Sequence, residues 1–238
     1  MPKTKIKTAD AAIKRIVSDN AAFMRSHPLV GFFDKFLGQQ TPFVTIVLCS
    51  DSRCQLEAFC SQPFNNAFEV ANAGNRFRAD KFSVSFAVKY LETPVLMVIG
   101  HTDCGAIKAA MGDYSGEDED ICAGLDGLHL ALKRDDESMP FETRVLINVI
   151  VNVNLQVEAA MRTYTDLVAT GKLTIIGGVF DMHNQLGKGN GKLHLFNINN
   201  AKTIAELSAH PACTELTEKQ KAATLLDLST LIPSGTKG

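Results

Sequence analysis

Cysteine and histidine follow two apolar runs of this chain, in positions where both could bind a soft metal ion. Cys49 ends the run VTIVLC at 44–49. His101 and Cys104 come directly after the run PVLMVIG at 94–100. Two thiolates and one imidazole are a ligand set that zinc prefers, and three protein ligands leave a fourth position open for a reactant. The residue types and their spacing therefore predict a catalytic zinc site.

A carboxylate and a guanidinium lie next to the first of these ligands. Asp51 and Arg53 are two residues apart just after the apolar run, so both side chains can face the metal. Arginine lowers the pKa of a neighbouring aspartate, and an ionised carboxylate could accept the proton of a water on the metal. If Arg53 released Asp51, the carboxylate could instead become the fourth ligand and block the site. An ordinary surface ion pair is the alternative interpretation of these two residues.

Three other roles remain open for the cysteines. The Cys–His–Cys set could be a closed structural zinc site with Asp51 as its fourth ligand, or its thiols could form a reversible redox pair. A framework of three disulfides is the third possibility, but it is typical of short secreted chains rather than of a chain of 238 residues. The remaining cysteines have no metal-type spacing with a histidine and are expected to be buried or free thiols: Cys54, Cys60, Cys122 and Cys213.

The segments that must position these residues alternate between strands and helices. Apolar, largely β-branched runs predict strands at 43–49, 94–99 and 173–180, and we expect a further short strand at 66–71 and a final edge strand at 192–196. Helices are expected at 8–37, 79–91, 105–111 and 141–164, with an exposed acidic loop at 112–120. Strands separated by helices pair in parallel, and their working residues collect at the carboxyl ends. We therefore predict an α/β fold with a central, mainly parallel four-stranded sheet, an added antiparallel edge strand and flanking helices, in which Cys49 and His101 meet at one edge.

Three short motifs resemble the signature blocks of one enzyme family. CSDSR at 49–53, NAGN at 72–75 and GHTDCGA at 100–106 are similar to the three blocks of the β-class carbonic anhydrases, in the family's order and at family-like separations. NVNLQV at 152–157 and GGVFD at 177–181 also resemble family segments, so the resemblance extends over most of the chain.

This resemblance implies a role for each of the residues singled out above. Gln40, nine residues before the first cysteine ligand, stands where family members carry a glutamine that reaches a substrate pocket across the dimer. Gly105 would help the backbone approach the ligand. The zinc ligands and the catalytic dyad implied by the resemblance are Cys49, His101 and Cys104, and Asp51 with Arg53.

The implied reaction is attack of hydroxide on a small linear substrate, most simply the reversible hydration of carbon dioxide to bicarbonate. Hydrolysis of carbonyl sulfide or carbon disulfide to hydrogen sulfide is the runner-up, because neighbouring branches of the family attack the same carbon with the same site. A non-catalytic zinc protein is a weaker alternative, against which the presence of Arg53 argues. Three departures from the family leave the choice between carbon dioxide and carbonyl sulfide undecided. Ala71 stands where many family members have arginine, the segment 181–187 is longer than the usual turn, and the chain lacks tryptophan.

The composition limits the partners of the chain. A formal net charge of −2 does not indicate the excess of basic residues that is typical of a nucleic-acid-binding protein. No apolar run reaches the roughly 18 residues of a membrane span, and the start lacks the apolar core of a signal peptide, so we expect a cytoplasmic protein. The phenylalanines at 32–36 would be costly on a free surface. We therefore predict that 1–40 is a helical dimerisation arm and that 41–238 is the α/β zinc-binding catalytic domain of a homodimer or homotetramer.

Overall fold

The structure is a computed structural model that describes residues 8–26, 34, 37–130, 132 and 138–231. The chain divides into two compact units, residues 1–40 and 41–238, and each is described by itself. In the first unit, helix α1 spans Ala9–Ser26, which confirms the first part of the helix expected there. Residues 27–33 and 35–36 of that expected helix lie outside the described residues, and they include four of the five residues of the phenylalanine segment 32–36. Leu37 lies in a bend, so the expected helix does not extend to it.

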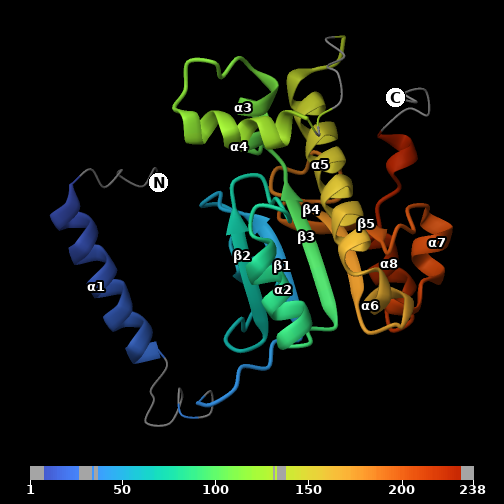
Figure 1. Ribbon diagram of the computed structural model, residues 1–238, viewed down its shortest axis with the longest axis horizontal. Helices are drawn as coiled ribbons and strands as arrows, with labels where there is room; N and C mark the ends of the chain where they lie inside the picture. The colour runs from blue at the N-terminus through green and yellow to red at the C-terminus, as the bar shows by residue number, and fades with distance from the viewer. Residues whose placement is uncertain (1–7, 27–33, 35–36, 131, 133–137, 232–238) are drawn as a thin grey trace. The chain divides into compact units, whose positions relative to one another are not determined.

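One sheet of five strands forms the centre of the second unit (Figure 1). Its strands lie in the order β2-β1-β3-β4-β5. All neighbours pair in parallel except β4 and β5, which are antiparallel. The strand bounds are β1 Val44–Cys49, β2 Ala67–Asn72, β3 Val95–His101, β4 Thr174–Asp181 and β5 Lys192–Ile198. The predicted fold class is confirmed, with four parallel strands and one antiparallel edge strand.

The long helix α5 (Phe141–Thr163) packs across β3 and β4. A buried apolar stripe along this helix, including Val149 and Val153, faces the strands. Glycine permits the close approach, because a Cβ built on Gly100 would lie 2.6 Å from Cγ1 of Val149. The helix therefore lies directly behind the end of β3, the strand that carries His101.

Shorter helices complete the second unit. Helix α3 (Gly105–Met111) follows β3 as expected. Helix α2 (Lys81–Ser85) continues into a π-helical turn, η3 (Phe86–Tyr90), so the helix expected at 79–91 is present but changes its hydrogen bonding halfway. The 3-10 turns are η2 Leu56–Ala58, η4 Pro211–Cys213 and η5 Leu228–Thr230. The helices that the sequence analysis did not predict are α4 Glu119–His129, α6 Thr165–Ala169, α7 Ile204–Ala209 and α8 Glu218–Thr224.

The acidic segment at 112–120 is a loop only in its first part. Helix α4 begins at Glu119, inside the segment expected to be a loop. Acidic side chains in a first helical turn are favoured by the partial positive charge there, so Glu119 and Asp120 help this helix to begin. Among the helices of the described residues, none combines the length and the apolar character that crossing a membrane requires.

Candidate metal centre

The three expected ligands meet at the carboxyl ends of two neighbouring strands. Cys49 is the last residue of β1, His101 is the last residue of β3, and Cys104 precedes the first residue of α3. Because β1 and β3 are adjacent and parallel, their ends lie at the same edge of the sheet. All three side chains are buried, and their ligand atoms lie within 4.8 Å of one another. The two sulfur atoms are 4.0 Å apart.

The His101 ring is held in the tautomer that a metal ligand needs. Its Nδ1 lies 2.9 Å from the backbone carbonyl oxygen of Thr102, an acceptor, so Nδ1 carries the proton and donates it there. The Nε2 atom then has a free lone pair, and it is fully buried with no hydrogen-bond partner in the described part of the chain. A buried nitrogen without a partner is costly, and a cation at the two sulfurs would remove that cost.

The two thiols also fit a cation. The hydrogen bond from Cys104 lowers the pKa of Cys49, whereas the same bond together with burial raises the pKa of Cys104. The backbone N–H of Gly74 donates to Cys49 Sγ at 3.4 Å and supports a thiolate there. Of the two sulfurs, that of Cys49 is therefore the one that more readily becomes a thiolate. A second thiolate requires nearby positive charge, which a divalent metal ion would supply.

Asp51 and Arg53 lie beside this cluster as a two-point ion pair. Arg53 donates from Nε to Asp51 Oδ1 at 2.9 Å and from Nη2 to Asp51 Oδ2 at 2.7 Å. These bonds hold the pKa of Asp51 well below its usual range, so the carboxylate is ionised. Its Oδ2 lies 3.9 Å from Nε2 of His101. The aspartate is thus held by arginine at the edge of the cluster.

Asp103 is a member of this charged group that the sequence analysis did not identify. Its Oδ2 accepts a hydrogen bond from Arg53 Nη1 at 2.7 Å, and its backbone oxygen accepts from Arg53 Nη2 at 3.1 Å. Lys108, one turn into α3, pairs with the other carboxylate oxygen of Asp103. The available signal was a carboxylate between two ligand positions in the motif GHTDCGA.

Buried amides on α5 hold the NAGN turn against the cluster. Asn152 donates from Nδ2 to the backbone oxygen of Gly74 at 2.9 Å. Gln156 in turn donates to Asn152 Oδ1 at 3.0 Å and accepts from the backbone N–H of Phe77 at 3.0 Å. Since Gly74 contacts Cys49 Sγ, these two amides position a donor to a ligand from the far side of the turn.

The two residues expected to bind substrate are placed differently. Gly105 begins α3 next to Cys104, and a Cβ built on it would meet nothing within 4 Å. Within the part of the chain that the structure describes, no contact therefore requires glycine at this position. Gln40 is exposed and is the last residue of the first unit, so its role stays a prediction.

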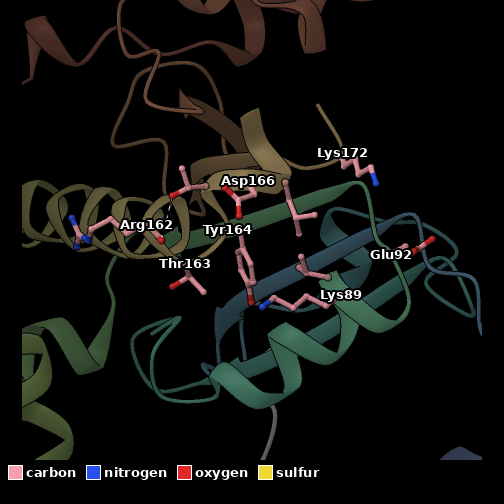
Figure 2. A pocket seen from close by; sticks show the side chains of 10 residues that line it. Lys89, Glu92, Arg162, Thr163, Tyr164, Asp166 and Lys172 are labelled. Carbon is pink, nitrogen blue, oxygen red and sulfur yellow. Dashed lines mark hydrogen bonds between the residues drawn. The ribbon is translucent and has the colours of Figure 1, made fainter. Parts of the chain in front are cut away.

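A hollow lies at the opposite end of the strands, away from the cluster (Figure 2). It has a volume of about 670 Å³ and is lined by residues from η3, the end of α5 and α6. Glu92 and Lys172, on its rim, precede β3 and β4, so the hollow faces the amino ends of the strands. None of its lining residues is a cysteine or a histidine: Val88, Lys89, Glu92, Arg162, Thr163, Tyr164, Thr165, Asp166, Leu167 and Lys172.

Comparison with known proteins relates the chain to one group of enzymes. The family model for carbonic anhydrase matches residues 44–189. A carbonic anhydrase of Mycolicibacterium smegmatis is 32% identical over 107 residues, which cover 42% of this chain and 52% of that protein. A carbonic anhydrase of Synechococcus elongatus is 28% identical over 168 residues, which cover 64% of this chain and 61% of that protein. The chain thus spans little more than half the length of these two relatives.

Solved structures share the fold. One of two tetrameric β-carbonic anhydrases from Sordaria macrospora has a TM-score of 0.67 at 23% identity, and the match covers 78% of this chain and 96% of that one. A β-carbonic anhydrase of Coccomyxa, solved with acetazolamide, has a TM-score of 0.62 at 19% identity over 87% of this chain and 92% of that one. At these identities the likeness is one of fold.

Proposed function

Since this chain belongs to the β-class carbonic anhydrase family, we propose that it is an enzyme that catalyses the reversible hydration of carbon dioxide to bicarbonate with Zn²⁺. The observation that carries the proposal is the buried cluster of Cys49, His101 and Cys104, whose imidazole presents a free Nε2 to two thiols. The ionised Asp51 beside the cluster is the second support.

The three buried side chains would hold the zinc ion. A zinc ion there would act as a Lewis acid that lowers the pKa of a coordinated water to about 7 and so supplies a nucleophile at neutral pH. The protein would contribute a neutral imidazole, fixed by its bond to the Thr102 carbonyl, and two sulfurs that become thiolates when the metal binds.

Asp51 would orient the attacking water. Its Oδ2 is close enough to the cluster to accept a hydrogen bond from a water there. Because Arg53 lowers the pKa of this carboxylate, a proton taken up at Oδ2 would leave again quickly to solvent. We therefore assign Asp51 the role of hydrogen-bond acceptor and short-lived proton carrier. Arg53 keeps it ionised and in place.

Gln40 and Gly105 would contact the substrate, and Gln40 would do so from a second copy of the chain. Four apolar side chains of α1 are exposed, which supports a role for this helix in binding another subunit: Ile13, Ile16, Val17 and Met24. A homodimer or homotetramer is thus part of the proposal. A monomer demonstrated by sedimentation that hydrates carbon dioxide at an undiminished rate would contradict it.

The decisive experiment compares two substrates on one preparation of known zinc content. It measures kcat/KM for carbon dioxide hydration by stopped flow and for carbonyl sulfide hydrolysis by release of hydrogen sulfide. Fast hydration with only trace sulfide release is the expected result. Weak hydration with efficient sulfide release would contradict the proposal and identify a carbonyl sulfide hydrolase. A zinc-loaded protein with neither activity would identify a non-catalytic zinc protein.

A further inference from the structure

We propose that Asp103, anchored by Lys108, is a positioning residue that holds Arg53 in the orientation in which it binds Asp51. The expected loss of kcat on removing Asp103 rests on the proposed function. The orientation of Arg53 by Asp103 rests on the geometry alone. It extends the pair of Asp51 and Arg53 to a row of four alternating charges near the carboxyl ends of β1 and β3. The row is Asp51, Arg53, Asp103 and Lys108.

The guanidinium of Arg53 is enclosed between two carboxylates. Two of its donors bind the Asp51 carboxylate, a third binds Asp103 Oδ2, and Nη2 also reaches the backbone oxygen of Asp103. A guanidinium is rigid and planar, so it cannot turn away from Asp51 without losing its bonds to Asp103 as well. The side chain of Arg53 is 44% exposed, and these bonds offset the conformational entropy that holding a long side chain in one rotamer at the surface costs.

Lys108 fixes the far side of this arrangement. Its Nζ pairs with Oδ1 of Asp103 while Arg53 occupies Oδ2, so both carboxylate oxygens have a cationic partner. Lys108 belongs to α3, the helix that begins directly after the ligand Cys104. Single exposed ion pairs contribute little, but in this network the two inner charges, Arg53 and Asp103, each have two partners, which restricts their side chains more.

The backbone of Asp103 makes a clean test possible. Its φ is +62°, in the left-handed region that glycine and asparagine also adopt readily. Asp103→Gly therefore removes the carboxylate without straining the turn between the two ligands. Asp103→Asn is the matched control, because its amide oxygen can still accept the bond from Arg53.

The kinetic experiment is a double-mutant cycle on the zinc-loaded protein, with zinc content measured for every variant. We expect Asp103→Gly to lower kcat for carbon dioxide hydration about tenfold at unchanged zinc content, because misplacing a catalytic group is costly. Asp103→Asn should retain most of the rate, and Lys108→Met should cost about threefold at most. In an Arg53→Ala background, Asp103→Gly should have no further effect, since Asp103 acts through Arg53. Equal losses in both backgrounds, or zinc loss in step with the rate, would overturn the proposal.

A spectroscopic measurement tests the same inference without any turnover. The protein is loaded with cobalt(II) in place of zinc, and its visible absorption reports whether a carboxylate has joined the metal. We expect Asp103→Gly to shift the spectrum in the same direction as Arg53→Ala, because Asp51 is released in both, and Asp103→Asn to match the wild type. A wild-type spectrum for Asp103→Gly would contradict the positioning role. If the wild type hydrates no carbon dioxide, the proposed function fails while this spectroscopic test still decides the positioning role.

Discussion

The two ends of the central sheet differ in how well their polar groups are satisfied. At the carboxyl ends of β1 and β3, a fully buried imidazole nitrogen has no hydrogen-bond partner among the described residues and faces two thiols. At the amino ends, the hollow (Figure 2) is large, about 670 Å³, but the polar side chains that line it are hydrogen-bonded or exposed. The Tyr164 hydroxyl is 2.9 Å from that of Ser85, and Lys89 Nζ lies 5.7 Å from the centre of the Tyr164 ring.

This difference shows that volume is a weaker guide to chemistry in this molecule than an unsatisfied buried atom. A second buried histidine limits the rule. His194 on β5 is also fully buried, and neither of its ring nitrogens has a hydrogen-bond partner in the described part of the chain. It belongs to no group of three potential metal ligands within the described residues. An unsatisfied imidazole therefore predicts a metal site only where other ligands converge on it.

Removing one ligand of the cluster should have the largest effect. His101→Ala leaves two sulfurs, which hold zinc poorly, so we expect bound zinc to fall close to zero and kcat/KM to drop about a thousandfold or more. Metal analysis after dialysis and stopped-flow hydration check this. His194→Phe is the matched control at the other buried histidine and should keep its zinc. Full zinc content in His101→Ala would contradict the proposal that the metal binds at the carboxyl ends of β1 and β3.

Removing the carboxylate beside the cluster should cost less and should leave the metal in place. For Asp51→Ala we expect kcat to fall about a hundredfold at unchanged zinc content, the range found when one acid–base group is deleted. Asp51→Asn keeps the size of the side chain and separates the loss of charge from the loss of volume. An undiminished kcat in both variants would show that Asp51 is only a partner of Arg53.

His194 should make the fold sensitive to mild acid. Burial lowers the pKa of His194 below 6.5, Lys188 and Lys192 lower it further, and Asp181 opposes them. Below pH 6.5 the unfolded chain therefore binds a proton that the folded chain does not. The free energy of unfolding should fall as the pH falls through this range, by at most about 1.4 kcal/mol per pH unit, and should be unaffected above it.

Urea unfolding at pH 7.5 and pH 5.5 measures this loss. His194→Phe cannot bind the proton, so its loss of stability between the two pH values should be smaller than that of the wild type. Identical losses in the two proteins would show that His194 already reaches water or a partner in solution.

Changes in the hollow should have the smallest effect on activity. Tyr164→Phe removes the hydrogen bond to Ser85, so we expect a loss of about 1 kcal/mol in the free energy of unfolding. Its kcat/KM for hydration should stay within about twofold of the wild type, because the residue lies at the far edge from the cluster. Lys172→Ala, on the exposed rim, should change neither quantity. A tenfold loss of kcat/KM for hydration in either variant would show that the hollow at the amino ends of the strands contributes to the activity.

The sheet was accessible from the sequence because its three central strands, β1, β3 and β4, are nearly continuous apolar runs. All five strands lie within two residues of the predicted bounds, and the order of strands and helices determined the parallel pairing. The C-terminal helices α7 and α8 were missed although each carries a readable start signal. Thr203 with Glu206 and Thr217 with Gln220 form capping boxes, but the helices that follow are short and show little apolar periodicity.

The cluster of three potential metal ligands was predictable from the sequence, but the arrangement of charges beside it was less so. The rule that functional residues collect at strand ends was sufficient to bring Cys49 and His101 together. The contact between Asp103 and Arg53 depends on a left-handed residue in the turn before α3, and no pattern of residue types specifies that conformation. The roles of Gln40 and of the dimer stay predictions, since they concern a second copy of the chain.

The glycine near the end of β3, Gly100, has a consequence for how easily the strand end that carries His101 can open. Val149 and Val153 of α5 fill the space that a side chain at Gly100 would need, so the strand end carrying His101 is covered by the core helix. The backbone N–H of Thr102 also donates to the Phe180 oxygen at 3.0 Å, which pairs the chain beyond the ligand. Local opening of this segment would have to separate α5 from the sheet. If zinc binds as proposed, its release by displacement of His101 would therefore require an event close to global unfolding.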